Sequence, residues 1–174
     1  MRRINPSFAL GCLAISVAGL IGCQDQTEPR IVDARLEVLS AEPITDANPL
    51  TETAEALQSD QAPPTVAVRG RVGAGDLDPF DPTTASFFIS EIIEDPDGGE
   101  GHDAGTCPFC KRRAAKAPKG LIRLVDEERQ VLSVRADELL NLDVGDIIQA
   151  RGVPRYDPDA NVITIDAIEV HVES

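Results

Sequence analysis

The chain has 174 residues, with 16 basic and 30 acidic side chains and a formal net charge of −14. This length suits one modest domain with additional segments. A negative field of this size repels phosphate backbones and anionic lipid surfaces, so the composition argues against nucleic-acid binding. It favours cationic partners or metal ions, and it serves solubility equally well.

The N-terminus reads as an export signal. Two arginines precede a mostly apolar run over residues 8–21. That run is about 14 residues long, whereas a helix that crosses a bilayer needs roughly 20. We therefore expect residues 1–22 to be a cleaved signal peptide and not a permanent membrane span.

The end of this signal, Leu20-Ile21-Gly22-Cys23, resembles the lipobox of bacterial lipoproteins. The resemblance implies cleavage before Cys23, whose thiol would carry the lipid that anchors the chain to the membrane. Gln24 follows the cysteine, and by resemblance this places the chain in the cell envelope, at the outer membrane facing the periplasm. Without Arg2 and Arg3, 14 basic residues stand against 30 acidic ones, a net charge of −16.

Only one pair of unmodified cysteines is expected in the mature chain. Cys12 would leave with the signal peptide and Cys23 would be lipidated. Cys107 and Cys110 then remain together in an oxidising compartment.

Residues 23–64 are predicted to be a disordered linker that follows the lipidated cysteine. The segment is rich in acidic residues, Thr, Ala and Pro, and it has no aromatic side chain. Only residues 31–39 have the pattern of a short element. Such a composition buries too little apolar surface to offset its ordering entropy. We expect the folded domain to span residues 65–174.

The domain has the pattern of a small all-β protein. Apolar and polar residues alternate in several short runs, and one short helical run precedes the last two of them. This order fits a small closed Greek-key barrel with one or two short helices. The predicted strands are 66–72, 85–93, 120–125, 130–134, 146–152 and 161–172, with the helix at 136–142.

Residues 66–72 and 142–152 resemble the first strand and the helix-to-fourth-strand corner of OB-fold domains. An open β-sandwich is the structural alternative. OB-folds often bind single-stranded nucleic acid through aromatic side chains and a basic groove. The acidic charge, the export signal and the few aromatics argue against that ligand, and leave a protein partner on the barrel face. Arg69, Arg71, Arg151 and Arg155 are expected on a solvated face.

An insertion at about residues 94–119 separates the second and third strands. It contains Cys107-Pro-Phe-Cys110, followed by an alanine-rich basic stretch with good helix propensity. Thr106 is the expected N-cap, and Pro118 with Gly120 would end the helix. The cysteines would then lie on the first turn of a basic helix, where the helix dipole favours the thiolate.

The first interpretation of this pair is a soft-metal site for zinc or copper(I). Cys-Pro-x-Cys resembles the knuckle of zinc-ribbon proteins, and His102 lies near enough to join Cys107 and Cys110 as a third ligand. Asp103, His171, water or a partner would have to supply a fourth ligand. His171 itself alternates with valines on the last strand and is expected to face solvent.

Two other interpretations remain open. Cys107-Pro-Phe-Cys110 resembles the active-site tetrapeptide of glutaredoxins, which implies thiol-disulfide exchange, although the resemblance ends with these four residues. A plain disulfide in a structural binding module is the third interpretation. The sequence contains no Ser-His-Asp pattern, phosphate loop or His-Glu-x-x-His motif. It therefore favours a non-enzymatic binding protein.

Overall fold

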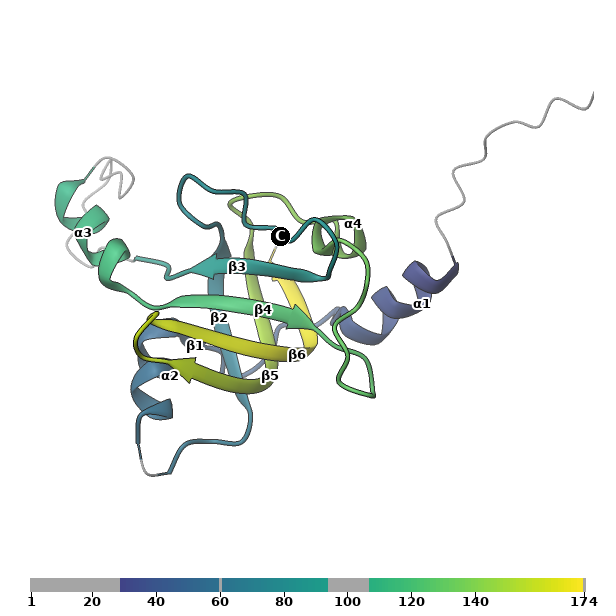
Figure 1. Cartoon of the computed structure of the whole chain (residues 1–174), viewed down its shortest axis with the longest axis horizontal. Helices are drawn as coiled ribbons and strands as arrows, with labels where there is room; N and C mark the ends of the chain where they lie inside the picture. The colour runs from purple at the N-terminus through teal and green to yellow at the C-terminus, as the bar shows by residue number, and fades with distance from the viewer. Residues whose placement is uncertain (1–28, 60, 94–106, 174) are drawn as a thin grey trace, which may run out of the picture.

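The computed structural model describes residues 29–59, 61–93 and 107–173. Within these ranges, five strands close into a barrel (Figure 1). In chain order the barrel strands are β2 (Val66–Val72), β3 (Ser86–Ser90), β4 (Lys119–Leu124), β5 (Ile147–Asp157) and β6 (Val162–Glu173).

The strand order confirms the predicted fold class. β3 lies between β2 and β4, β6 lies between β4 and β5, and β5 pairs back with β2 to close the barrel. Neighbouring strands are antiparallel except β4 and β6, which run parallel. The chain passes through α4 (Ala136–Leu140) and β5 before β6 returns beside β4. The molecule is an all-β, OB-fold-like Greek-key barrel with short helices, and the open sandwich is excluded.

Alternation of side chains builds the core. On β6, Ile163, Ile165 and Ala167 point inward and are fully buried. Phe87 and Phe88 are consecutive on β3, so their side chains point to opposite sides of the sheet. Phe87 is buried in the core and Phe88 is partly exposed on the outer face.

The predicted strand at 130–134 does not form. Only Val131 makes a bridge, to Val125, and the chain then runs across the end of the barrel. Leu132 and Val134 pack against the core there, and the Leu132 carbonyl accepts a hydrogen bond from the Ala85 amide. The alternation of this segment therefore reflects packing against the barrel end and not sheet pairing.

Residues 29–59 are more ordered than the sequence suggests. They form α1 (Pro29–Val38), the two-residue strand β1 (Asn48–Pro49) and α2 (Leu50–Leu57). β1 pairs in parallel with β2, and α2 packs its apolar face against the barrel. The linker prediction is therefore wrong for residues 38–57. The polar average composition of this segment concealed the apolar residues of α2 at helical spacing, Leu50, Ala54 and Leu57, and the buried Val38 at the end of α1.

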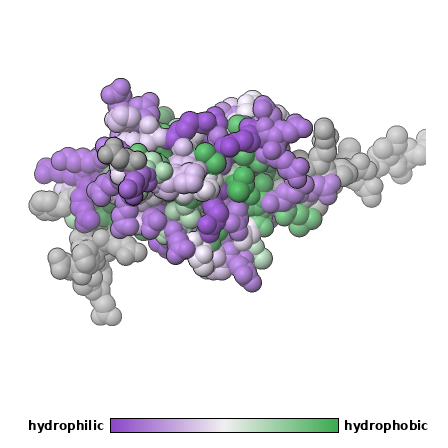
Figure 2. All heavy atoms as spheres, turned by 90° about the horizontal axis from the view of Figure 1, so that it is seen from below, coloured by the Kyte–Doolittle hydropathy of each residue, from purple (hydrophilic) through white to green (hydrophobic). Residues whose placement is uncertain are grey.

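The face of the molecule shown in Figure 2 is mainly hydrophilic, with apolar side chains between the polar ones. Among the residues that the structure describes, no helix has the length and apolar character needed to cross a membrane. The predicted signal peptide 1–22, the lipidation site Cys23 and residues 94–106 of the insertion, including His102, lie outside the described residues. The most exposed large apolar side chains are Leu36, Leu77, Val144 and Ile168.

Candidate functional site

The candidate site lies at the start of α3 (Pro108–Lys116), which extends from one end of the barrel between β3 and β4 (Figure 1). The N-cap of this helix is Cys107, and not Thr106 as predicted. Pro108 follows at the first helical position, where its missing N–H costs nothing. The helix ends at Lys116, before Pro118, as the sequence predicted.

The cap geometry brings the two cysteines together. The Cys107 sulfur accepts a hydrogen bond from the Cys110 amide, with 3.4 Å between Sγ and N. The three-residue spacing places both side chains on the first turn of the helix. Cys107 is partly exposed, whereas Cys110 is only 5% exposed.

The electrostatics of α3 suit an anionic sulfur at its start. The N-terminal end of a helix carries partial positive charge from its first amides, and this charge stabilises a nearby anion. The first turn of α3 has no acidic residue that would compete with a thiolate. Arg112, Arg113 and Lys116 follow along the exposed side of the helix.

The other end of α3 is attached to the barrel by Asn161, in the turn between β5 and β6. Its amide nitrogen donates to the Lys116 carbonyl at 3.0 Å, and its amide oxygen accepts from the Tyr156 hydroxyl at 2.9 Å. Asn161 has a positive φ of 54°, a conformation that Asn tolerates better than most residues. This contact joins residues 45 positions apart in the chain, and no local sequence pattern predicts it.

The histidines do not complete the site within the described residues. His102 and Asp103 fall outside these residues, so the predicted His102, Cys107 and Cys110 set stays a prediction. His171 lies on β6, nine residues beyond Val162, which pairs with Lys119 just after α3. Among the described residues it forms no metal-holding group with the two cysteines.

His171 also differs from its predicted environment. Its ring is partly covered by the segment that follows α1, and Nδ1 lies 3.1 Å from the Ser40 carbonyl oxygen. Across residues 29–59, 61–93 and 107–173, no group of three or more His, Cys, Asp or Glu side chains is arranged to hold a metal ion. A metal on the two sulfurs would need ligands from elsewhere.

The predicted arginine face is present, and its members contact acidic or carbonyl oxygens. Arg69 bonds to Glu173 through Nε at 2.7 Å, and this hydrogen bond lowers the pKa of the Glu173 carboxyl. Arg151 pairs with Glu169 at 3.2 Å. Arg71 donates to the Gly145 carbonyl, and Arg155 joins a larger cluster around Asp166. Three of the four arginines are thus engaged in ion pairs, and Arg71 is engaged by a backbone carbonyl.

Fold and site together define an OB-fold-like barrel that carries a Cys-x-x-Cys pair at the start of an added helix. Comparison with protein-family models and with curated proteins finds no match to the chain.

Proposed function

We propose that Cys107 and Cys110 form a redox-active dithiol that exchanges disulfides with a protein partner. The geometry at the start of α3 carries this proposal. The first cysteine caps the helix and is partly exposed, and the second is buried one turn later, with its amide bonded to the first sulfur. A knuckle-type metal site would instead hold the pair in a turn, whereas here the tetrapeptide begins a helix.

The arrangement gives the two sulfurs different roles. As a thiolate, the partly exposed Cys107 attacks one sulfur of a partner disulfide and releases the other as a thiolate. Cys110, held beside it, then attacks the Cys107 sulfur and releases the partner's second thiolate. Two electrons pass to the partner, and Cys107 and Cys110 become a disulfide. A dithiol protein restores the pair, and the reverse direction oxidises partner thiols.

The proposal includes the cellular location. The Leu20 to Cys23 motif supports a lipid anchor on Cys23, and therefore a position in the cell envelope, facing the periplasm. Exchange of protein disulfides is suited to such an oxidising compartment. The acidic charge of the chain favours a partner with a basic surface.

A soft-metal site is the second candidate function. It is supported by two sulfurs on one helical turn and by an amide donor to the Cys107 sulfur, because hydrogen bonds to a ligating atom orient it toward the metal. Zinc or copper(I) would bind Cys107, Cys110 and His102, with a further ligand from a partner. In that case the chain would be a binding protein and not an oxidoreductase.

A trapping experiment tests the proposal on the full chain in non-ionic detergent. Incubated with a disulfide-bonded test protein, C110S should accumulate a mixed disulfide through Cys107, because the resolving sulfur is absent. C107S should not, and wild type should resolve the adduct rapidly. The control is L36A, which truncates an exposed side chain of α1 and should resolve the adduct as wild type does. Adducts are counted by non-reducing mass spectrometry.

Metal analysis and redox titration of the same samples distinguish disulfide exchange from a metal site and from a structural disulfide. Stoichiometric zinc or copper that is lost in C107S and C110S, with no mixed disulfide in C110S, would overturn exchange and support the metal site. If the disulfide between the two cysteines has a reduction potential below about −300 mV, it is a structural disulfide. That result would overturn both disulfide exchange and the metal site.

A further inference from the structure

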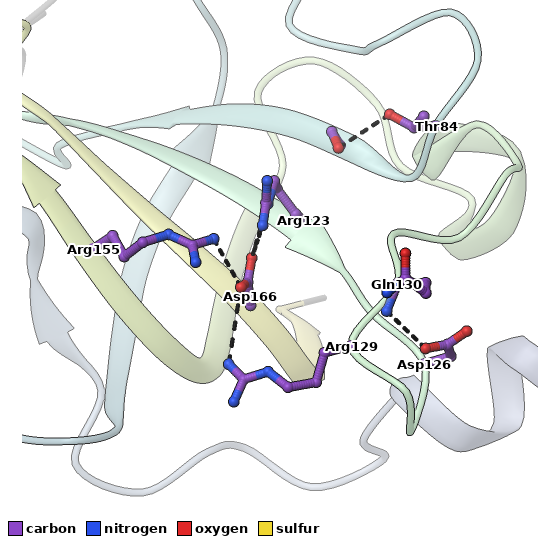
Figure 3. A network of polar contacts seen from close by, with 8 residues as sticks. Thr84, Arg123, Asp126, Arg129, Gln130, Arg155 and Asp166 are labelled. Atoms are coloured by element: carbon purple, nitrogen blue, oxygen red, sulfur yellow. Dashed lines mark hydrogen bonds and ion pairs between the residues drawn. The ribbon is translucent and has the colours of Figure 1, made fainter.

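A second cluster of charged residues lies on the outer face of the barrel, around Asp166 of β6. Its carboxylate is 5% exposed, although the residue points outward, because arginines from three elements cover it (Figure 3). Arg123 of β4 donates from Nε to Oδ1 at 2.8 Å, and Arg155 of β5 donates from Nη2 to Oδ2 at 2.8 Å. Arg129, in the turn after β4, places Nη2 3.9 Å from Oδ2.

The cluster contains more positive charge than the buried carboxylate needs. A buried carboxylate requires one well-oriented cation to offset its desolvation, and Arg123 provides it with two donors to one oxygen. Arg129 and Arg155 add two further positive charges. Counting only the four side chains in contact, three arginines around one carboxylate leave two positive charges, in a chain with 16 basic and 30 acidic side chains.

Arg129 is held in a strained backbone conformation. Its φ is 63°, in the left-handed region, which costs a non-glycine residue roughly 1–2 kcal/mol. Its amide closes the turn onto the Asp126 carbonyl at 2.9 Å, and the Asp126 carboxylate is engaged by the Gln130 amide. Glycine would adopt this turn without strain. The presence of arginine therefore points to a role for its side chain.

The donors of two arginines face solvent. The Arg129 side chain is 56% exposed and the Arg155 side chain is 59% exposed, and each directs one Nη2 toward Asp166. A guanidinium has five N–H donors, so both retain donors for a second oxyanion. The neighbouring Glu127 and Glu128 are exposed, and solvent ions screen their charge.

We propose that Arg129 and Arg155, oriented by Asp166 and Arg123, form a binding site for a phosphate-type oxyanion. Two forked guanidiniums match the several oxygens and the double charge of a phosphate better than a single lysine would. Asp166 orients the Arg155 guanidinium through a hydrogen bond at 2.8 Å and attracts that of Arg129 at 3.9 Å, which reduces the ordering cost of binding. The site is separate from the thiol pair, so the two proposals can fail independently.

Calorimetric titration tests this site on the full chain in non-ionic detergent, at constant ionic strength in chloride buffer. One arm adds inorganic phosphate, and a second adds micelles containing phosphatidylglycerol, so that a free phosphate and a lipid headgroup are distinguished. We expect saturable binding that is about tenfold weaker or more in R129Q and in R155Q. R151Q, which breaks a one-to-one ion pair on the same strand, should bind as wild type does. Thermal melting verifies that each variant is folded.

Binding in either arm, with this pattern of variants, supports the site and identifies the source of the phosphate. Absence of binding in both arms at millimolar ligand would overturn it. An equal loss in R151Q would also overturn it, because the attraction would then be a general effect of surface charge. C107S should leave phosphate binding unchanged.

Discussion

Gly152 marks a point where two strands approach too closely for a side chain. A Cβ atom there would lie 2.2 Å from the Asp166 carbonyl oxygen and 2.7 Å from the Ala167 Cα. The register between β5 and β6 shifts at this point, so that Ile168 is left between paired residues and is exposed. The bulge changes the twist of both strands. It precedes Arg155 on β5 and follows Asp166 on β6, so it helps to place both on one face.

Replacing Gly152 with alanine should therefore destabilise the barrel. The clash is with backbone atoms, which cannot rotate away, and we expect a loss of about 2 kcal/mol or more in the free energy of unfolding. Gly73→Ala is the matched control, because no atom lies within 4 Å of the position that a Cβ would take there. The control should change stability by less than about 1 kcal/mol. Urea denaturation measures both, and equal stability of the two variants would contradict the explanation.

At the scale of elements, α3 is a short helix with several hydrogen bonds at its C-terminal end. Asn161 bonds to its last turn, and the Lys119 amide bonds to the Asn161 carbonyl at 3.0 Å. Lys119 also reaches the Ala114 carbonyl through Nζ at 3.5 Å. The thiol pair at the opposite end of the helix is thus fixed to the β5–β6 turn through the helix itself.

Asn161→Gly should loosen α3 without unfolding the barrel. Glycine accepts the positive φ but removes the bonds to Tyr156 and Lys116, so the amides of α3 should exchange with solvent several-fold faster. Asn141→Gly is the control, since Asn141 also has a positive φ, of 58°, but lies beside α4. Hydrogen exchange followed by mass spectrometry makes the comparison. Unchanged exchange in α3 would mean that other contacts hold the helix.

At the scale of the molecule, the folded unit extends beyond the barrel. Leu50 at the start of α2 is fully buried. Its Cδ2 methyl group packs against Gly120, 3.1 Å from the position that a Cβ would take there. Thr53 and Ala54 are buried on the same helix. The segment before residue 65 thus closes one part of the core and belongs to the domain.

Leu50→Ala should lower the free energy of unfolding by about 2–5 kcal/mol, because it removes a fully buried side chain and leaves a cavity. Leu36→Ala is the matched control, since Leu36 is 76% exposed, and its effect should stay within about 0.5 kcal/mol. Thermal or urea unfolding provides the measurement. If both substitutions had the same small effect, α2 would not be part of the cooperative unit.

Much of this architecture was predictable from the chain, because its signals are local. The alternation in residues 66–72 and 161–172 predicted strands, and the run of alanines and basic residues after Cys110 predicted the helix that carries the thiols. Pro118 predicted where that helix ends. Helix propensity, capping and side-chain alternation act over a few residues, so they can be recognised without knowing which segments meet.

Contacts between distant segments were decided only in the tertiary structure. Asp166 meets Arg123, 43 positions away, because β4 and β6 pair in parallel, and no local pattern predicts that pairing. The sequence placed Leu50 in a polar linker, because its burial depends on the barrel surface against which α2 packs. The sequence offered His171 as a possible fourth ligand for the thiols. In the structure His171 lies near the end of β6 and contacts the Ser40 carbonyl oxygen. The sequence by itself determined the five barrel strands and the thiol-bearing helix, and barrel closure decided which of their side chains meet.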